Sequence, residues 1–233
     1  MYFESLHQQI DDRRIDAYAR AMGFVSGIGR LSHLTDDVLI DILKKVHIRN
    51  GLRVLDLGAG RGFLPRWLSW RGIDIDYVGI DFSESAIAAA RRNAPGSRFV
   101  QTDFFERPQL GTFDLVFAIE ATGDGYVTPG LANVMLEALR PGGIAIATIV
   151  TIRAGFDDAL ADSRSAFEAR GGRVVLRDYT AKTEPFVKRL CELVLADPAG
   201  PGDLREKSQT ESSMFLASIE KGTYGYAVAM ATK

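Results

Sequence analysis

Short apolar runs alternate with helical stretches through the middle of the chain. We predict strands at 52–57, 75–80, 98–101, 113–119 and 144–151. Between them we predict a helix at 63–70, one that Ser83 caps and Asn93 to Gly96 terminate, and one that begins at Thr128-Pro129 and closes at Pro141-Gly-Gly143. Several strands are apolar without alternation, which is typical of a parallel sheet covered on both faces. The pattern therefore predicts a doubly wound, Rossmann-like α/β fold with helices on both faces.

The flanking segments carry weaker patterns. We predict helices at 4–20 and 36–46, the second capped by Thr35, with a glycine-containing turn at 23–29 between them. After the core we expect a helix near 157–169, a strand at 173–179, a helical pattern from Phe186 to Val194, a loop at 197–203, a helix at 204–221 and a strand at 224–232. The simplest organisation is one domain over 1–233. It has a helical cap at 1–50, a cofactor-binding core at 51–151 and a substrate-side half at 152–233, with a helical insertion at about 184–221.

Composition and charge exclude several classes of protein. The 233 residues include 28 Lys and Arg against 30 Asp and Glu, a net charge of −2, with no block of like charges. This argues against nucleic acid or an anionic membrane surface as the partner. The single cysteine, Cys191, excludes a disulfide framework and a multi-thiolate metal site, and we predict no metal. The longest apolar run, 144–150, is too short to span a bilayer, and the N-terminus is dense in charge, so we expect a cytoplasmic protein.

A glycine-rich turn follows the first predicted strand of the core. In Asp56-Leu-Gly58-Ala59-Gly60-Arg-Gly62, glycines at alternate positions allow the backbone to approach a ligand closely. The third glycine comes one residue too early for a dinucleotide fingerprint, and no P-loop Gly-Lys-Ser/Thr is present. Asp56 would repel a phosphate, whereas it suits a cationic ligand.

Two more acids end the next two strands. Asp81 is placed to accept hydrogen bonds from both hydroxyls of a ribose, although it could instead stabilise the helix N-terminus ahead of Ser83. Asp103 could accept a hydrogen bond from an exocyclic amine while Phe104 or Phe82 packs on a purine. Three acids at successive strand ends, with no basic residue to meet a phosphate, favour a positively charged nucleoside.

These residues together resemble the class I S-adenosylmethionine-dependent methyltransferases. The first motif, the ribose-binding acid and the adenine-binding acid of that family match 56–62, Asp81 and Asp103, and 139–143 resembles the segment before its fifth strand. The resemblance covers about 52–151. It implies seven strands, mostly parallel with an antiparallel last strand, S-adenosylmethionine as cofactor and S-adenosylhomocysteine as product. It also places Ala59, Phe82, Phe104, Ile119 and Glu120 beside the cofactor.

The end of the fourth strand carries the candidate catalytic groups. The run Ala118-Ile-Glu-Ala-Thr122 resembles the same place in sterol and related isoprenoid C-methyltransferases. Methylation of an alkene would leave a carbocation that Glu120, Asp124 and Tyr126 could stabilise. An O–H or N–H nucleophile would instead need a base, for which Glu120, Asp124 and His33 are candidates. Glu120 could also contact only the cofactor or a structural N–H, and His33 could be structural.

The acceptor is expected to be a small molecule enclosed by the N-terminal segment and the late insertion. Tyr18, Phe24, Tyr126 and Phe186 are the candidate substrate contacts. We favour C-methylation of an isoprenoid-like or other apolar substrate over O- or N-methylation of a small natural product. A cofactor-binding protein without methyl transfer, acting as a cyclase or a partner subunit, is the alternative from another class. We expect a monomer or a homodimer.

Overall fold

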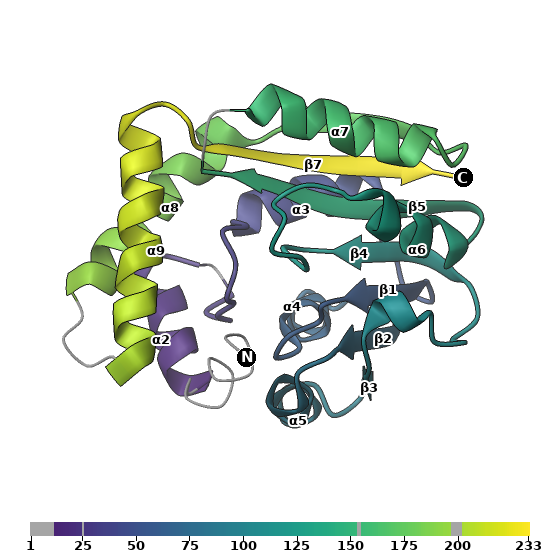
Figure 1. Ribbon diagram of the computed structural model, residues 1–233. Coiled ribbons are helices and arrows are strands. Elements are labelled where there is room, and N and C mark those ends of the chain that lie inside the picture. Colours follow the sequence, from purple (N-terminus) through teal and green to yellow (C-terminus); the bar gives the residue numbers. More distant parts are fainter. Residues whose placement is uncertain (1–11, 25, 153–154, 197–201) are drawn as a thin grey trace.

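The computed structural model describes residues 12–24, 26–152, 155–196 and 202–233. The strands are β1 (Arg53–Leu57), β2 (Asp76–Asp81), β3 (Arg98–Gln101), β4 (Phe113–Ala118), β5 (Leu139–Thr151), β6 (Arg173–Asp178) and β7 (Gly225–Thr232). They form one seven-stranded sheet in the order β3-β2-β1-β4-β5-β7-β6 (Figure 1).

The sheet is parallel except at one strand. β1 pairs in parallel with β2 and β4, and β7 runs antiparallel to both β5 and β6. The strand order reverses between β1 and β4, so the carboxyl ends of these two strands form the crevice where open α/β sheets bind ligands. The predicted doubly wound fold with an antiparallel last strand is confirmed.

Helices cover both faces of the sheet. The helices are α2 (Asp12–Ala21), α3 (Asp36–Lys45), α4 (Phe63–Trp70), α5 (Glu84–Asn93), α6 (Pro129–Glu137), α7 (Phe156–Glu168), α8 (Thr180–Ala196) and α9 (Gly202–Glu220), with a 3-10 turn η1 (Phe104–Glu106). One core cluster joins α3, α4 and α5 to the sheet through residues such as Ile42, Trp67 and Ile87. The other joins α6 and α7 through Met135 and Phe167. Each face therefore buries its own apolar layer.

The predicted helix caps agree with the structure. The side chains of Thr35, Ser83 and Thr128 accept hydrogen bonds from the backbone N–H groups of Val38, Ala86 and Leu131. These bonds satisfy donors that the first turn of a helix leaves free, and they fix where α3, α5 and α6 begin.

Some predicted boundaries differ from the observed ones. The helix expected to continue to Pro141 ends at Glu137, and β5 already begins at Leu139, which pairs with Phe113 of β4. The register shifts directly after this pair, and β7 pairs with β5 only from Ile144 onward. Pro141 therefore lies where no ladder bond on the β7 side is needed, which a proline tolerates. The expected helix at 4–20 and the expected loop at 197–203 lie partly outside the described residues.

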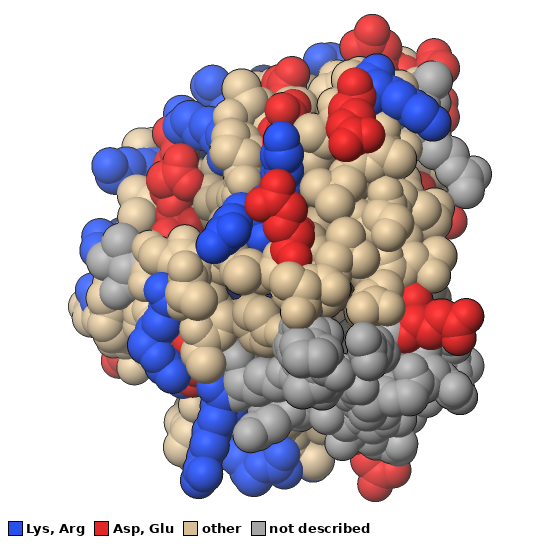
Figure 2. Space-filling model, turned by 90° about the vertical axis from the view of Figure 1, so that its left-hand side faces the viewer, with Lys and Arg blue, Asp and Glu red and all other residues tan. Residues whose placement is uncertain are grey.

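Three helices stand beside the carboxyl ends of the parallel strands. α2, α8 and α9 lie together on the left in Figure 1, and α8 and α9 are the elements between β6 and β7. Figure 2 views the molecule from this side, where uncharged surface is interspersed with both acidic and basic side chains. Within the described ranges, no helix combines the length and the apolar character needed to cross a bilayer.

Candidate functional site

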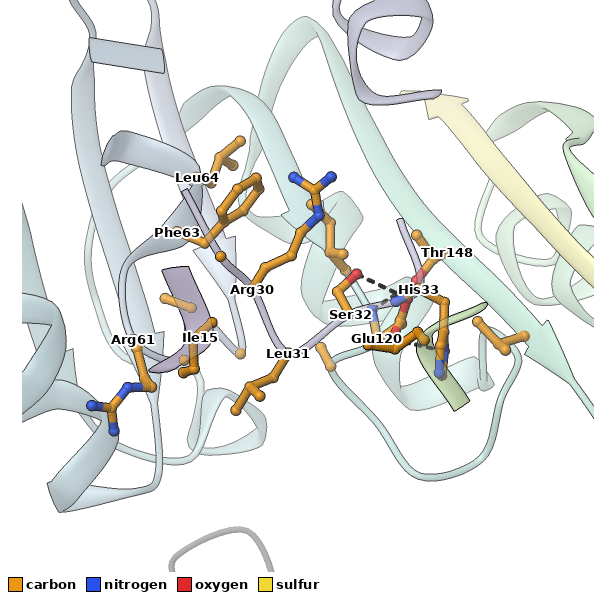
Figure 3. Close-up of a pocket in the computed structure, with 18 of the residues that line it drawn as sticks. Ile15, Arg30, Leu31, Ser32, His33, Arg61, Phe63, Leu64, Glu120 and Thr148 are labelled. Atoms are coloured by element: carbon orange, nitrogen blue, oxygen red, sulfur yellow. Dashed lines mark hydrogen bonds and ion pairs between the residues drawn. The ribbon is translucent and has the colours of Figure 1, made fainter. Parts of the chain in front are cut away.

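A cavity of about 710 Å³ opens at the carboxyl ends of β1, β2, β4 and β5. Its wall combines α2, the segment 29–33, the turn between β1 and α4, and the facing sides of α8 and α9 (Figure 3). Segments that are far apart in the sequence thus enclose one space at the switch point of the sheet. This is the expected place for a ligand in such a fold.

The glycine-rich turn forms one wall of this cavity. Gly58 and Gly60 line it, with φ of 74° and 53°. A Cβ on Gly58 would lie 2.8 Å from the Cβ of Ala121, so only glycine leaves room there. Gly62, also predicted to contact the cofactor, is not among the residues that line the cavity. A Cβ there would lie 3.1–3.2 Å from Phe99 and Ala90, so Gly62 allows α4 to begin close to α5.

Asp81 holds this turn from the end of β2. Its Oδ2 accepts a hydrogen bond from the Gly60 N–H at 2.9 Å, and its Oδ1 accepts one from the Ser83 N–H at 2.9 Å. Each carboxylate oxygen can accept a second bond, so both remain able to meet ligand hydroxyls. Asp81 and the half-exposed Phe82 line the cavity. The helix-terminal role and the ligand-binding role are compatible in this geometry.

Asp56 is a buried carboxyl in the cavity wall. The Tyr77 hydroxyl donates to its Oδ2 at 2.6 Å. Burial raises the pKa of Asp56 to about 7, the Tyr77 hydrogen bond opposes this rise, and the charge of Asp81 adds to it. A bound cation beside Asp56 would favour its ionised form.

Of the two residues after β3 that were expected to contact the adenine, only Phe104 lines the cavity. Phe104 is buried and lines the cavity, whereas Asp103 is exposed and is not among the lining residues. Its Oδ1 accepts a hydrogen bond from the Phe105 N–H at 2.9 Å and so caps the short turn η1. Asp103 therefore has a local structural partner in place of a ligand-facing position.

Glu120 lies at the centre of a hydrogen-bond cluster after β4. Its backbone has φ of 49°, and its N–H donates to the Thr148 hydroxyl at 2.7 Å. Its Oε1 accepts from the Ser32 hydroxyl at 3.0 Å, the His33 N–H at 2.9 Å and the Tyr226 hydroxyl at 3.3 Å. The left-handed conformation directs the side chain toward the segment 29–33, as the dashed lines in Figure 3 show. Glu120 thus fastens this segment over the strand ends.

The second oxygen of Glu120 faces the His33 ring. His33 Nδ1 lies 3.4 Å from Oε2, and the imidazole packs against the Phe215 ring of α9 with 4.3 Å between ring centroids. Burial acts to raise the pKa of Glu120, but the neighbouring His33 and the Ser32 hydroxyl outweigh it and hold the pKa below its usual value. The Glu120 carboxylate thus faces His33 Nδ1, which is buried and makes no hydrogen bond among the described residues.

Only some of the other residues predicted to contact the cofactor or the substrate line the cavity. Tyr18, Phe24 and Ile119 line it, together with Ala59. Phe186 is not a lining residue; its ring packs on Phe24 with centroids 5.1 Å apart.

The loop after Glu120 borders the cavity, but its two other candidates do not line it. Asp124 is exposed, and Tyr126 packs against the core cluster of α6 and α7. Gly123 and Gly125 line the cavity, and the Gly125 carbonyl accepts a hydrogen bond from the Val150 N–H at 2.8 Å, which binds the loop to β5.

Several residues of the site were not identified from the sequence, and one of them, Tyr226, lies behind the cavity wall and contacts it through Glu120. Ser32 and Tyr226 complete the Glu120 cluster, and Arg30 enters the wall beside Phe63. The polar run Arg30-Leu-Ser-His33 directly before the Thr35 cap is a signal that could have indicated Arg30 and Ser32. No sequence pattern pointed to Tyr226, which sits in a buried strand.

The described ranges contain no group of three or more His, Cys, Asp or Glu side chains arranged to hold a metal ion. The candidate chemistry of the site therefore rests on the glycine turn, the buried acids and the His33–Glu120 pair.

Comparison with known proteins gives a consistent picture. A family model described as a methyltransferase domain matches residues 48–187. A demethylmenaquinone methyltransferase of Beutenbergia cavernae is 35% identical over 133 residues, covering 52% of this chain and 54% of the relative. Sterol 24-C-methyltransferases of Debaryomyces hansenii and Schizosaccharomyces pombe also match, at 32% and 30% identity. The chain spans about half the length of the first curated relatives that it matches.

Two solved structures share the fold. A phosphoethanolamine N-methyltransferase 2 of Haemonchus contortus superposes with a TM-score of 0.71 at 20% identity, covering 97% of this chain and 58% of the other. The 4+2 cyclase SpnF superposes with a TM-score of 0.67 at 21% identity, covering 95% of each chain. These likenesses concern the architecture.

Proposed function

Because the chain belongs to the methyltransferase domain family, we propose that it is an S-adenosylmethionine-dependent methyltransferase acting on a small molecule. The observation that carries this proposal is one cavity lined by the Gly58–Gly60 turn and the buried carboxyls of Asp56 and Asp81. These residues offer close backbone approach, acceptors for hydroxyls and negative charge for a cation. No phosphate-binding loop competes for this place.

The chain's residues fit the cofactor at the level of chemistry. A Cβ at Gly58 would meet Ala121, so the glycine turn packs directly against the residue after Glu120 and presents backbone to the cavity. Asp81 would accept from ribose hydroxyls, Asp56 would face a cationic group, and Phe82 and Phe104 would pack on the base. When bound, S-adenosylmethionine supplies a methyl group already activated by a sulfonium. The protein must then position the acceptor, exclude water and remove a proton.

His33 is the group best placed to remove that proton. Glu120 holds the His33 backbone and faces Nδ1, so Nε2 is the nitrogen left to accept a proton from the acceptor. Nδ1 lies 3.4 Å from Oε2 and makes no hydrogen bond among the described residues, so this pair would have to tighten when the acceptor binds, as catalytic hydrogen bonds often do. In this arrangement Glu120 is the positioning residue and His33 the base.

The acceptor would be a small, largely apolar molecule with an acidic proton. Apolar side chains from α2, α8 and α9, such as Ile15, Val194 and Phe215, line the cavity and suit an apolar body. The preference for alkene C-methylation depended on Glu120, Asp124 and Tyr126, and two of these do not line the cavity. We therefore favour an acceptor whose O–H, N–H or activated C–H loses a proton to His33.

A cyclase without methyl transfer is the second candidate. It is the activity named for SpnF, a fold neighbour that matches this chain over 95% of each chain. In that case the same cavity would bind the cofactor while another compound reacts beside it.

A turnover assay separates the two candidates. Purified protein is incubated with S-adenosylmethionine and a panel of phenols, amines, acids and isoprenoid alcohols, and S-adenosylhomocysteine is quantified. Methyl transfer predicts acceptor-dependent product that falls at least about tenfold in His33→Asn, within the usual contribution of a general base, and little in Asp124→Asn, an exposed control. Tight cofactor binding with no product across the panel would favour the cyclase.

A further inference from the structure

Arg30 is a buried cation in the cavity wall that the mechanism above does not use. Its side chain is 2% exposed. It comes from the segment that Glu120 fastens over the strand ends, and Figure 3 shows its guanidinium beside the Phe63 ring. A fully buried arginine normally has each of its N–H groups engaged.

The hydrogen bonds of this guanidinium are incomplete. Nε donates to the Leu34 carbonyl at 2.6 Å, and Nη2 donates to Asp36 Oδ1 at 3.0 Å. The same Asp36 oxygen also accepts from the Trp67 indole at 3.1 Å, so it is shared. Nη1 is buried and has no hydrogen-bond partner within the part of the chain that the structure describes.

Two aromatic rings hold the guanidinium in place. Its central carbon lies 4.2 Å from the centroid of Phe24 and 4.4 Å from that of Phe63. Both rings also line the cavity. Since aromatic rings favour contact with the guanidinium plane, a further polar partner must approach its edge, where Nη1 lies.

The other arginines of the cavity differ in this respect. Arg61 donates to Asp12 at 2.8 Å, and Arg66 donates through both terminal nitrogens to Asp16 at 3.1 and 2.5 Å. Their carboxylate partners come from α2. Among the arginines of the cavity, Arg30 is therefore distinguished by a buried N–H that finds no acceptor in the described ranges.

We propose that Arg30 binds a carboxylate of a ligand in this cavity, through Nη1. The inference rests on the proposed function and names a recognition element within it. A planar carboxylate matches the edge of a guanidinium. A phosphate fits less well, because Asp56, Asp81 and Glu120 line the same cavity and would repel a doubly charged group. The carboxylate comes either from the amino-acid part of the cofactor or from an acidic acceptor.

A ligand cycle tests the first source. S-adenosylhomocysteine and its carboxamide, which lacks only the carboxylate charge, are titrated calorimetrically into the wild type, Arg30→Met and Arg30→Lys. If the cofactor supplies the group, the wild type prefers the carboxylate by about tenfold or more, and Arg30→Met binds both ligands equally. Arg30→Lys retains part of the preference. Because both ligands are compared on one variant, a partly unfolded fraction does not mimic this result.

A second cycle tests the other source. Octanoate and octanamide are titrated into protein saturated with S-adenosylhomocysteine. An acceptor site predicts that Arg30→Met weakens octanoate by about tenfold and leaves octanamide unchanged. Arg66→Met is the matched control, since both terminal nitrogens of Arg66 already bind Asp16, and it should leave both preferences as in the wild type.

The outcomes separate this inference from the proposed function. Two results overturn the Arg30 assignment while cofactor binding stands. In one, the wild type binds the carboxylate and the carboxamide of each pair with equal affinity. In the other, Arg30→Met keeps the wild-type preference for the carboxylate. Competition by inorganic phosphate that depends on Arg30 would also overturn the carboxylate assignment. Failure of the wild type to bind S-adenosylhomocysteine at all would instead remove the proposed function.

Discussion

The ionisation of Asp56 should make cofactor binding depend on pH near neutrality. In the ligand-free protein burial raises its pKa from 3.8 to about 7. This difference corresponds to roughly 4 kcal/mol against the buried charge. A cationic ligand beside Asp56 needs the ionised form. That form is about one tenth of the population at pH 6 and about nine tenths at pH 8 if the pKa is about 7.

We therefore expect S-adenosylmethionine, whose sulfonium carries the positive charge, to bind roughly tenfold more tightly at pH 8 than at pH 6, as measured by isothermal titration calorimetry. Asp56→Asn should remove most of this pH dependence. The sign for stability is opposite, because the folded pKa lies above 3.8. The stabilisation that Asp56 provides is complete below pH 3.8 and is lost as the pH rises through about 7.

His33 needs a separate control because it faces the same cavity as Asp56. His33→Asn should keep the pH dependence if Asp56 is responsible. An affinity that is constant between pH 6 and pH 8 in the wild type, or a slope that survives in Asp56→Asn, would refute the reasoning.

Other substitutions test the remaining parts of the site. Asp81→Ala should weaken S-adenosylhomocysteine binding at least several-fold and cost about 1–3 kcal/mol of stability for the unpaired N–H groups; calorimetry and thermal melts measure both, and the exposed Asp103→Ala should leave the affinity unchanged. Glu120→Gln should lower kcat about tenfold or more with an affinity for S-adenosylhomocysteine within about threefold of wild type, and the reverse pattern would place Glu120 in the cofactor shell. Gly58→Ala, with a Cβ 2.8 Å from the nearest atom, should cost about 2–4 kcal/mol. Gly51→Ala, strained in φ with nothing within 4 Å, should cost less in urea unfolding.

The sequence was sufficient for the parts of the site that depend on local order along the chain. Asp56 and Asp81 lie at the carboxyl ends of apolar strands, and Gly58 comes directly after the first of them. Parallel strands bring their carboxyl ends to one edge of the sheet. The number of strands and the antiparallel last strand came from the family resemblance, and the order of the strands was not predicted, since periodicity alone does not fix pairing.

The contacts that complete the site could not be predicted in this way. Ser32 meets Glu120 across 88 positions of sequence, and Tyr226 meets it across 106. No periodic pattern encodes such a pairing. The same holds for Asp124, whose side chain is exposed although its neighbours Gly123 and Gly125 line the cavity; residue types in a loop do not show which side chains face inward.

The central claim is that the cavity binds a cationic nucleoside, and competitive titration tests it most directly. S-adenosylmethionine, S-adenosylhomocysteine, NADH and ATP are each titrated into the purified protein at fixed pH and salt. We predict saturable one-site binding of the first two and none of the phosphorylated compounds. Tight binding of NADH or ATP, or no binding of S-adenosylmethionine, would contradict the account.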